Sequence, residues 1–392
     1  MVGQRTDPVI IVSNDVVPGL GVPVAAPGLR AYGLAEGLRS HGFDVTTLVS
    51  KPPLEDQWKA LGNEVPPPTP EDVEVIAPRQ LKRYLETHAP ATVILINSNQ
   101  VDHLERMDGI TYVLDFFAPK VLETLYHERD EYPQRALQRL RERKIRAIEM
   151  ADAFIVNGQK KLPYFLGWLL QGERDIRRLP LEVVNMCVPL GWSETGPGSS
   201  QGPDGGVRFA VGGYLQSWSQ PGSWLQVLEG YLEQPGIGLD ILLPEHWGKG
   251  SQPKEENEHL EWLRENPSVR TYTPMVFSKF RGFLSNADVA LDLFDYNLER
   301  EYAMITRSIV ALAMGVPVVH PPFTEVSSMI SGHDAGWLVD PADTATLKDL
   351  LQSIIDEPEL VREKSENARQ LSAELIDPRV ATRPLAKIIK AL

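Results

Sequence analysis

The sequence has little cysteine, little histidine and no long apolar run. Its 392 residues include one cysteine, Cys187, and eight histidines. A single cysteine excludes an internal disulfide and a cysteine-based metal cluster, so we expect a reducing, cytoplasmic setting in which Cys187 is a small core residue. Because no window resembles a membrane span of about 20 apolar residues, we expect no transmembrane helix. The short apolar run near the N-terminus, "VIIVSND", predicts a first strand and not a signal segment.

Basic residues are also outnumbered, because 39 lysines and arginines face 53 aspartates and glutamates, for a net charge of −14. An acidic chain is not attracted to nucleic acid, so we expect no nucleic-acid partner. The chain has no H-E-x-x-H, no G-x-x-x-x-G-K-[ST] and no Ser-His-Asp order. A protease, a kinase and a metal centre are therefore unsupported, and we expect no bound metal.

The length is too great for one ordinary core and predicts two domains. A polar, glycine-rich stretch at 193–206, "SETGPGSSQGPDGG", is typical of a linker. We therefore predict an N-terminal domain over 1–192 and a C-terminal domain over 207–375. A last helix, 376–392, is expected to pack back toward the N-terminal domain.

Both halves alternate strands with helices, which predicts an α/β fold with a parallel sheet in each domain. Ligands of such sheets bind at the carboxyl ends of the strands, and two such domains leave a cleft between them. The fold class we expect is two Rossmann-like domains that face each other across a cleft. The strand candidates are "VIIVSND", "FDVTTLVS", "ATVILINSN", "ITYVLDFF" and "MADAFIVNG", then "VRFAVGG", "LDILLPE", "VRTYTPM", "DVALDLFDY", "VPVVHP" and "AGWLVDP".

Polar and glycine residues follow several of these strands in the first half. Gly19, Gly21 and Gly28 allow a ligand to approach the backbone, and the next helix offers its N-terminus to an anion, although an ordinary connection has the same composition. Arg30 opposes the local helix dipole, which suggests a ligand phosphate. Asp115 ends a buried strand and is either a turn residue or a group at the cleft.

The second half offers a comparable set. Gly213 belongs to a Gly-Gly turn that suits a phosphate, and Trp218 is either a core residue or a platform for a base or sugar. Arg307 lies in the first turn of a helix together with Thr306, where a cation has no dipole reason to exist, so we expect it to bind phosphate. Of the charged loop residues, we expect Glu299 to contact a ligand, while Arg300 and Glu301 are solvated. Thr324 and Glu325 predict another helix start at a strand's carboxyl end.

At this point the sequence resembles the GT-B glycosyltransferases, in particular family 4 and its relatives. The resemblance rests on "PGLRAYGLAEGLRSHGFDVTTLVS", "ADAFIVNG", "VNMCVPLG", "ALAMGVPVV" and "AGWLVDPAD", in this order along both halves. It implies sugar transfer from a nucleotide-diphosphate sugar to a glycan or lipid-linked acceptor. It also implies retention of anomeric configuration, no metal, and no cofactor other than the sugar nucleotide.

The chain departs from that family at its charged positions. The family's acidic pair falls on Tyr302 and Val310, and its arginine and lysine fall on Tyr214 and on Ser219 or Gln220. The sequence is more similar to a side branch of bacterial surface-polysaccharide glycosyltransferases through "LDFFAPKVLE", "GGYLQSW" and "EREYAMITR". That resemblance implies Asp115, Trp218, Glu299, Thr306 and Arg307 as this chain's own signature. We therefore expect Asp115, Arg307 and Glu299 to be catalytic. Around the nucleotide sugar we expect Gly19, Gly21, Gly213, Tyr214, Trp218, Thr306, Thr324 and Glu325.

Alternatives stay open at this stage. A GT-B protein that has lost its acidic pair could be an epimerase, an inverting transferase, or a silent protein that binds a nucleotide sugar or partners an active transferase. The segments "RLRERKIR" and "KKLPYFLGWLL" form either a basic, apolar face for an anionic membrane or a solvated helix beside a core segment.

Overall fold

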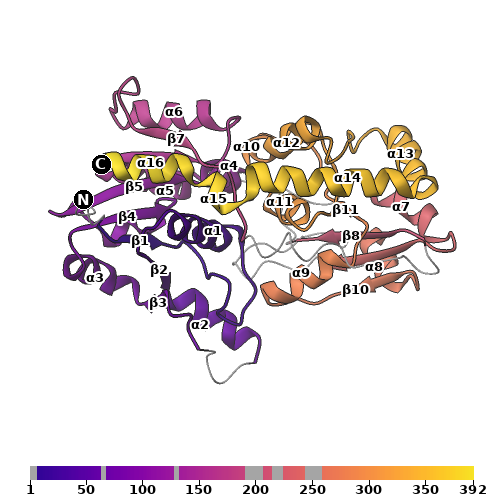
Figure 1. Cartoon of the computed structure of the whole chain (residues 1–392), viewed down its shortest axis with the longest axis horizontal. Coiled ribbons are helices and arrows are strands. Elements are labelled where there is room, and N and C mark those ends of the chain that lie inside the picture. The colour runs from indigo at the N-terminus through magenta and orange to yellow at the C-terminus, as the bar shows by residue number, and fades with distance from the viewer. Residues whose placement is uncertain (1–6, 63–67, 128–131, 190–205, 214–223, 243–257) are drawn as a thin grey trace. The chain divides into compact units, whose positions relative to one another are not determined.

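The computed structural model describes residues 7–62, 68–127, 132–189, 206–213, 224–242 and 258–392. The chain divides into two compact units, each built on its own sheet (Figure 1). Unit 1 comprises Met1–Thr124, Glu131–Pro189 and Leu375–Leu392, and unit 2 comprises Leu125–Asp130 and Leu190–Glu374. The predicted linker lies outside the described residues except for Gly206.

The sheet of unit 1 has seven strands among the described residues, and every recorded pair is parallel. Continuous apolar runs form its centre, as parallel strands covered on both faces require. β3 and β7 were not predicted because they are short and partly exposed. In spatial order the strands are β3 (Val73–Ile76), β2 (Val45–Ser50), β1 (Val9–Val12), β4 (Ala91–Ile96), β5 (Ile110–Phe116), β6 (Ala153–Val156) and β7 (Leu181–Val183).

Glycines let the first helix of unit 1 lie close to neighbouring chain segments. A Cβ at Gly28 would lie 1.7 Å from the Val16 carbonyl oxygen, and one at Gly37 would lie 2.3 Å from Thr382 Oγ1. The space beside Gly28 is therefore filled by backbone atoms and is not open to a ligand. The helices of unit 1 are α1 (Ala26–Ser40), α2 (Lys51–Ala60), η1 (Pro78–Gln80), α3 (Leu81–Thr87), η2 (Asn99–His103), α5 (Gln134–Met150), α6 (Leu162–Gln171), α15 (Pro378–Ala381) and α16 (Arg383–Ala391), and α4 (Lys120–His127) crosses the boundary between the units.

The sheet of unit 2 has six strands among the described residues, again with parallel pairs. Its strands in spatial order are β10 (Val269–Thr271), β9 (Gly238–Leu242), β8 (Arg208–Gly212), β11 (Val289–Leu291), β12 (Val318–His320) and β13 (Gly336–Leu338). Its helices are α7 (Trp224–Leu232), α8 (Glu258–Glu265), α9 (Phe277–Ser285), α10 (Leu298–Tyr302), α11 (Thr306–Ala313), α12 (Glu325–His333), α13 (Thr344–Asp356) and α14 (Pro358–Leu371). A short π-helix, Ser372–Ile376, follows α14 and continues into the last segment of unit 1.

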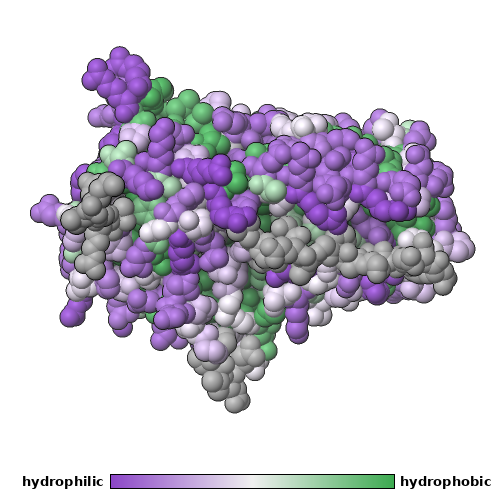
Figure 2. All heavy atoms as spheres, in the orientation of Figure 1, coloured by the Kyte–Doolittle hydropathy of each residue, from purple (hydrophilic) through white to green (hydrophobic). Residues whose placement is uncertain are grey.

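Each unit is thus a parallel sheet with helices, so the predicted fold class of two Rossmann-like domains is confirmed. The cleft between them stays a prediction. Polar side chains predominate over α14 in the view of Figure 2, whereas apolar side chains show at the surface beside α6. Among the described residues, no helix is long and apolar enough to cross a membrane.

Candidate functional site

The strand order of unit 2 reverses between β8 and β11. β9 and β10 lie on one side of this boundary, and β12 and β13 lie on the other. Parallel α/β sheets bind ligands at the carboxyl ends of the strands, at such a switch point. Gly213 follows β8 and Asp292 follows β11. We call these two residues, together with Arg307, the β8–β11 site.

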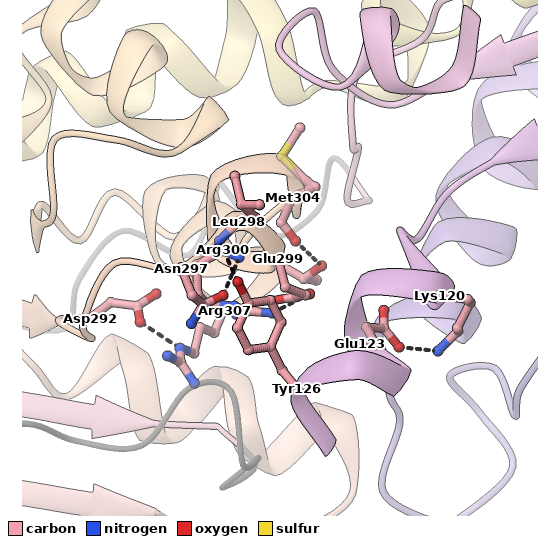
Figure 3. A network of polar contacts seen from close by, with 11 residues as sticks. Lys120, Glu123, Tyr126, Asp292, Asn297, Leu298, Glu299, Arg300, Met304 and Arg307 are labelled. Carbon is pink, nitrogen blue, oxygen red and sulfur yellow. Dashed lines mark hydrogen bonds and ion pairs between the residues drawn. The ribbon is translucent and has the colours of Figure 1, made fainter. Parts of the chain in front are cut away.

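Arg307 occupies this site through its guanidinium group, which projects from the first turn of α11 (Figure 3). Its Nε donates a hydrogen bond to Asp292 Oδ1 over 2.5 Å, and its Cζ lies 5.6 Å from the centre of the Phe294 ring. Nη1 and Nη2 donate no hydrogen bond to the part of the chain that the structure describes, and the side chain is 20% exposed. The described residues therefore leave the two NH₂ groups to an anion, while Asp292 holds Nε.

Gly213 makes this position of Arg307 sterically possible. Its φ of +135° lies in a region that favours glycine. A Cβ at this residue would lie 2.7 Å from Arg307 Cδ and 3.0 Å from Nη1. The turn after β8 and the Arg307 side chain are thus in contact, and a ligand contact of Gly213 itself stays a prediction.

Asp292 belongs to a buried set of polar side chains within unit 2. Ser308 Oγ donates to Asp292 Oδ2, and His320 Nδ1 lies 3.2 Å from the same Ser308 oxygen. On the other side of the ring, His320 Nε2 lies 2.7 Å from Thr324 Oγ1. Burial lowers the pKa of His320 to about 4, with Asp292 opposing the shift and Arg307 adding to it. His320 is therefore neutral at physiological pH.

Glu299 lies near this cluster in α10, and it is almost wholly buried. Both of its oxygens accept from Arg300, with Arg300 Nη2 2.8 Å from Oε1 (Figure 3). Arg300 is 12% exposed and lies over the Phe294 ring, so our expectation that it is solvated was wrong. Glu301 accepts a hydrogen bond from Tyr296. The role of Glu299 toward a ligand stays a prediction.

The remaining sequence candidates of unit 2 lie at helix starts. Thr324 is the N-cap of α12, as predicted, and forms a capping box with Ser327. Glu325 follows it and is 7% exposed, while Thr306 begins α11 and is partly exposed. Contacts of these three with a ligand stay predictions. Tyr214 and Trp218 lie outside the described residues.

Unit 1 carries a second arginine–carboxylate pair, between Arg30 and Asp115. Arg30 Nε lies 2.8 Å from Asp115 Oδ2, and Nη1 donates to the Asn185 carbonyl over 2.7 Å. Both side chains are 0% exposed. Burial raises the pKa of Asp115, and Arg30 and Lys161 oppose that shift. Arg30 thus pairs with Asp115 and does not bind a ligand phosphate. Contact of Asp115 with a substrate stays a prediction.

The loop after β1 places its two predicted glycines at the surface. Gly19 and Gly21 are exposed and have φ values of +96° and +69°. Nearby in the chain, Asp15 was missed by sequence reasoning, although it follows the first strand. Burial raises the pKa of Asp15 to about 6, while a hydrogen bond from the Val16 N–H and the charge of Lys120 oppose that shift.

Sequence reasoning also missed the partners of Arg307. Asp292 and His320 were visible as polar residues at the ends of apolar runs, but Ser308 gave no signal. The family's second carboxylate position falls on Val310, which is 1% exposed in the core. Among the described residues, the carboxylate that contacts Arg307 belongs to Asp292, directly after β11. Among the described residues, no cluster of His, Cys, Asp and Glu could hold a metal ion.

Comparisons with known proteins give a result for structure only, since no protein-family model and no curated protein matches the sequence. Sucrose-phosphate synthase from Thermosynechococcus elongatus is 14% identical with a TM-score of 0.70, and 98% of each chain is covered. HepE from Anabaena, in complex with UDP-glucose, is 12% identical with a TM-score of 0.66, covering 98% of this chain and 100% of HepE. WaaG, a glycosyltransferase involved in lipopolysaccharide biosynthesis, is 13% identical with a TM-score of 0.62, covering 98% and 100%. These neighbours are GT-B glycosyltransferases, and the chain described here has their GT-B fold.

Proposed function

We propose that this protein is a glycosyltransferase that moves a sugar from a nucleotide-diphosphate sugar to a hydroxyl group of a glycan or lipid-linked acceptor. The observation that carries the proposal is Arg307, whose two NH₂ groups are available at the switch point of unit 2 while Asp292 holds its Nε. A guanidinium in this state suits the two oxygens of a phosphate group. Support comes from HepE, which shares the fold and binds UDP-glucose.

Catalysis would depend on stabilising the leaving diphosphate. Negative charge grows on the phosphate oxygen as the bond to the sugar breaks, and a positioned cation lowers that barrier. Arg307 provides the cation, and the N-terminus of α11, where Thr306 lies, adds a positive dipole end. In this scheme no metal is required, and the sugar is a hexose transferred with retention of configuration.

Unit 1 is proposed to bind the acceptor. Gly19 and Gly21 present exposed backbone in the loop after β1, and their proposed ligand is the nucleotide sugar. Asp115, being buried against Arg30, would act by holding this edge of the sheet in place. Glu299, Thr324 and Glu325 are proposed to surround the nucleotide in unit 2, together with Tyr214 and Trp218.

The test is a panel of nucleotide sugars incubated with the whole protein, with and without bacterial glycan extracts. We expect release of free nucleoside diphosphate from one or a few donors, faster when the correct acceptor is present. If no donor releases its nucleotide under either condition, the enzyme proposal is wrong. NMR of the product anomer then separates retention from inversion or epimerisation.

A silent GT-B protein is the second candidate, and two observations favour it. Val310 is buried and Tyr302 is half-buried where the resembling family has its carboxylates. Such a protein binds a nucleotide sugar without releasing its nucleotide. Calorimetry that detects UDP-glucose binding, together with no turnover in the panel, would support this candidate.

A peripheral membrane contact belongs to the same proposal. α5 is rich in arginine, and α6 exposes Leu170, which is 57% exposed, although Phe165 and Leu169 are core residues. A basic helix beside an exposed apolar side chain can lie on an anionic membrane. Flotation with liposomes that contain anionic lipid should recover the protein. Equal recovery with neutral and anionic liposomes would rule out the proposed membrane contact.

A further inference from the structure

In the chain of polar groups behind Arg307, the contacts assign the donor and the acceptor of each hydrogen bond. The Asp292 carboxylate can only accept, so the single hydroxyl proton of Ser308 goes to Asp292 Oδ2. Toward His320, the Ser308 oxygen must then accept. Because His320 Nδ1 lies 3.2 Å from that oxygen, Nδ1 carries the ring proton.

The same reasoning fixes the other side of the ring. A neutral imidazole has one N–H, so Nε2 is an acceptor and takes the hydroxyl proton of Thr324 over 2.7 Å. Thr324 Oγ1 in turn accepts from the Ser327 backbone N–H at 3.2 Å. Each proton in the chain thus has one acceptor. An imidazolium would place a second N–H against Thr324, and the threonine proton would then turn from Nε2 to Ser327 Oγ, which lies 3.1 Å from Thr324 Oγ1.

This chain connects the start of α12 to the guanidinium of Arg307. Its four inner members are Asp292, Ser308, His320 and Thr324, which are 5%, 1%, 0% and 0% exposed. Buried polar groups that are fully satisfied hold one arrangement, because any shift leaves a donor or acceptor unpaired at a cost of about 1–3 kcal/mol. The first link, Asp292, is also the only described residue that accepts a hydrogen bond from Arg307.

We propose that His320, as the neutral Nδ1–H tautomer, is a positioning residue for Arg307. It keeps Ser308 directed at Asp292, and Asp292 then holds Nε and leaves the two NH₂ groups of Arg307 available. For the identity of the ligand, a nucleoside diphosphate, the inference rests on the proposed function. The residue itself touches no substrate in this scheme.

The first test needs no ligand and uses the whole protein with isotope-labelled histidine. Nitrogen chemical shifts of His320, assigned by comparison with His320→Phe, should show the Nδ1–H tautomer and no titration between pH 8 and pH 5. Burial of the ring lowers the pKa of His320, the charge of Asp292 opposes that shift, and the charges of Arg307 and Arg300 add to it. An Nε2–H tautomer, or titration near the ordinary histidine pKa, would overturn the inference.

The second test asks whether His320 acts through Arg307. UDP affinity is measured by calorimetry for wild type, His320→Phe, Arg307→Ala and the double variant. We expect His320→Phe to weaken UDP binding about 10-fold in the wild-type background and less than about 2-fold in the Arg307→Ala background. Equal factors in both backgrounds would mean that His320 has only a structural role. Ser308→Ala, which removes the same link with a smaller change, should reproduce the result if His320→Phe folds poorly.

The matched control is Ser327→Ala. It removes the reciprocal half of the capping box and leaves the bond between Thr324 and His320 in place. It should change UDP affinity by less than about 2-fold, and a loss as large as that of His320→Phe would assign the effect to the helix cap and overturn the inference.

If the proposed function is wrong, the wild-type protein does not bind UDP, and this result is distinct from a failure of the inference about His320. Exchange of the Arg307 Nε proton, followed by NMR of labelled arginine, then decides the inference without a ligand. Faster exchange in Ser308→Ala than in Ser327→Ala supports it, and equal exchange in the two variants overturns it.

Discussion

The pair Arg30–Asp115 of unit 1 and the pair Arg307–Asp292 of unit 2 both lie near the carboxyl end of a strand, and they differ in exposure. Arg30 and Asp115 of unit 1 are both 0% exposed, whereas Arg307 and Asp292 of unit 2 are 20% and 5% exposed. Arg30 uses Nε, Nη1 and Nη2 within the protein, on Asp115 and on the Asn185 carbonyl. Arg307 uses Nε alone among the described residues.

The difference teaches how the same chemistry serves two purposes. A guanidinium with all its nitrogens engaged and no solvent contact can only hold structure, and its removal leaves a buried charge without a partner. A guanidinium that is held by one nitrogen and is partly exposed keeps donors for a ligand. We therefore expect substitutions in the two pairs to affect different measurements.

The largest effect is expected for Arg30→Ala. Asp115 would be left buried without its cation, which typically costs about 3–5 kcal/mol in unfolding free energy. Urea unfolding of the whole protein, followed by tryptophan fluorescence, measures the loss. Replacing both members of the pair, as Arg30→Met with Asp115→Leu, should cost less than Arg30→Ala alone. A loss below about 1 kcal/mol for Arg30→Ala would show that the pair does not stabilise unit 1.

Arg307→Ala should affect activity more than stability, with a large loss of turnover and a small change in unfolding free energy. Removing one donor to a leaving group costs about 2.7–4 kcal/mol of barrier, or a 100- to 1,000-fold lower kcat/KM. The melting temperature should change by only a few degrees because the Arg307 side chain is partly exposed and Asp292 keeps its hydrogen bond from Ser308. Arg362→Ala is the matched control, since Arg362 is 71% exposed in unit 2 and pairs only with Glu359 among the described residues. A large drop in melting temperature for Arg307→Ala would make Arg307 a structural residue like Arg30.

The neutral His320 behind Arg307 should make unit 2 sensitive to acid. Its folded pKa of about 4 lies below the ordinary value of 6.5, so the unfolded chain takes up its proton first. Stability is therefore complete above pH 6.5 and falls as the pH is lowered toward 4, by about 2 kcal/mol at pH 5. Unfolding at pH 7.5 and pH 5 measures the change, and His320→Phe should lose this part of it. A His320→Phe protein with an unchanged pH dependence would contradict the assignment.

The smallest effect is expected for Asp15→Asn at the carboxyl end of β1. The folded pKa of Asp15, about 6, lies above the ordinary 3.8, so its contribution is present below pH 3.8 and is lost as the pH rises through 6. Removing the charge should stabilise the protein by about 1 kcal/mol at pH 7.5, after a discount for the partial exposure of the group, and by nothing at pH 3.5. Asp44→Asn, at an exposed position before β2, is the control. A loss of stability at pH 7.5 for Asp15→Asn alone would mean that its carboxylate is favourably bound in the folded state.

Much of the fold could be predicted because it follows from local patterns. Continuous apolar runs gave the central strands of both sheets, and Thr324 with Glu325 marked the start of α12. β3 and β7 escaped because three or four partly exposed residues give no clear period. For the site, the sequence identified Arg307 as a cation against the helix dipole, but it assigned the same role to Arg30.

The two arginines look alike in the sequence because each lies near the start of a helix that follows an apolar strand. Their partners are distant along the chain, with Asp115 85 positions from Arg30 and Asp292 15 positions from Arg307. Spacing in sequence does not determine which carboxylate a side chain meets. The same holds for Arg300, whose charge suggested a solvated residue and whose side chain pairs with buried Glu299.

The sequence by itself determined the two parallel sheets, because burial of apolar strands on both faces leaves a pattern in neighbouring residues. It also determined that polar groups gather at the carboxyl ends of the strands. Only the tertiary structure decided which of these polar groups are hydrogen-bonded within the protein and which are left to a ligand. That decision depends on burial and on hydrogen bonds between distant segments, and it separates Arg30, enclosed by Asp115 and Asn185, from Arg307, held by Asp292 with its NH₂ groups available.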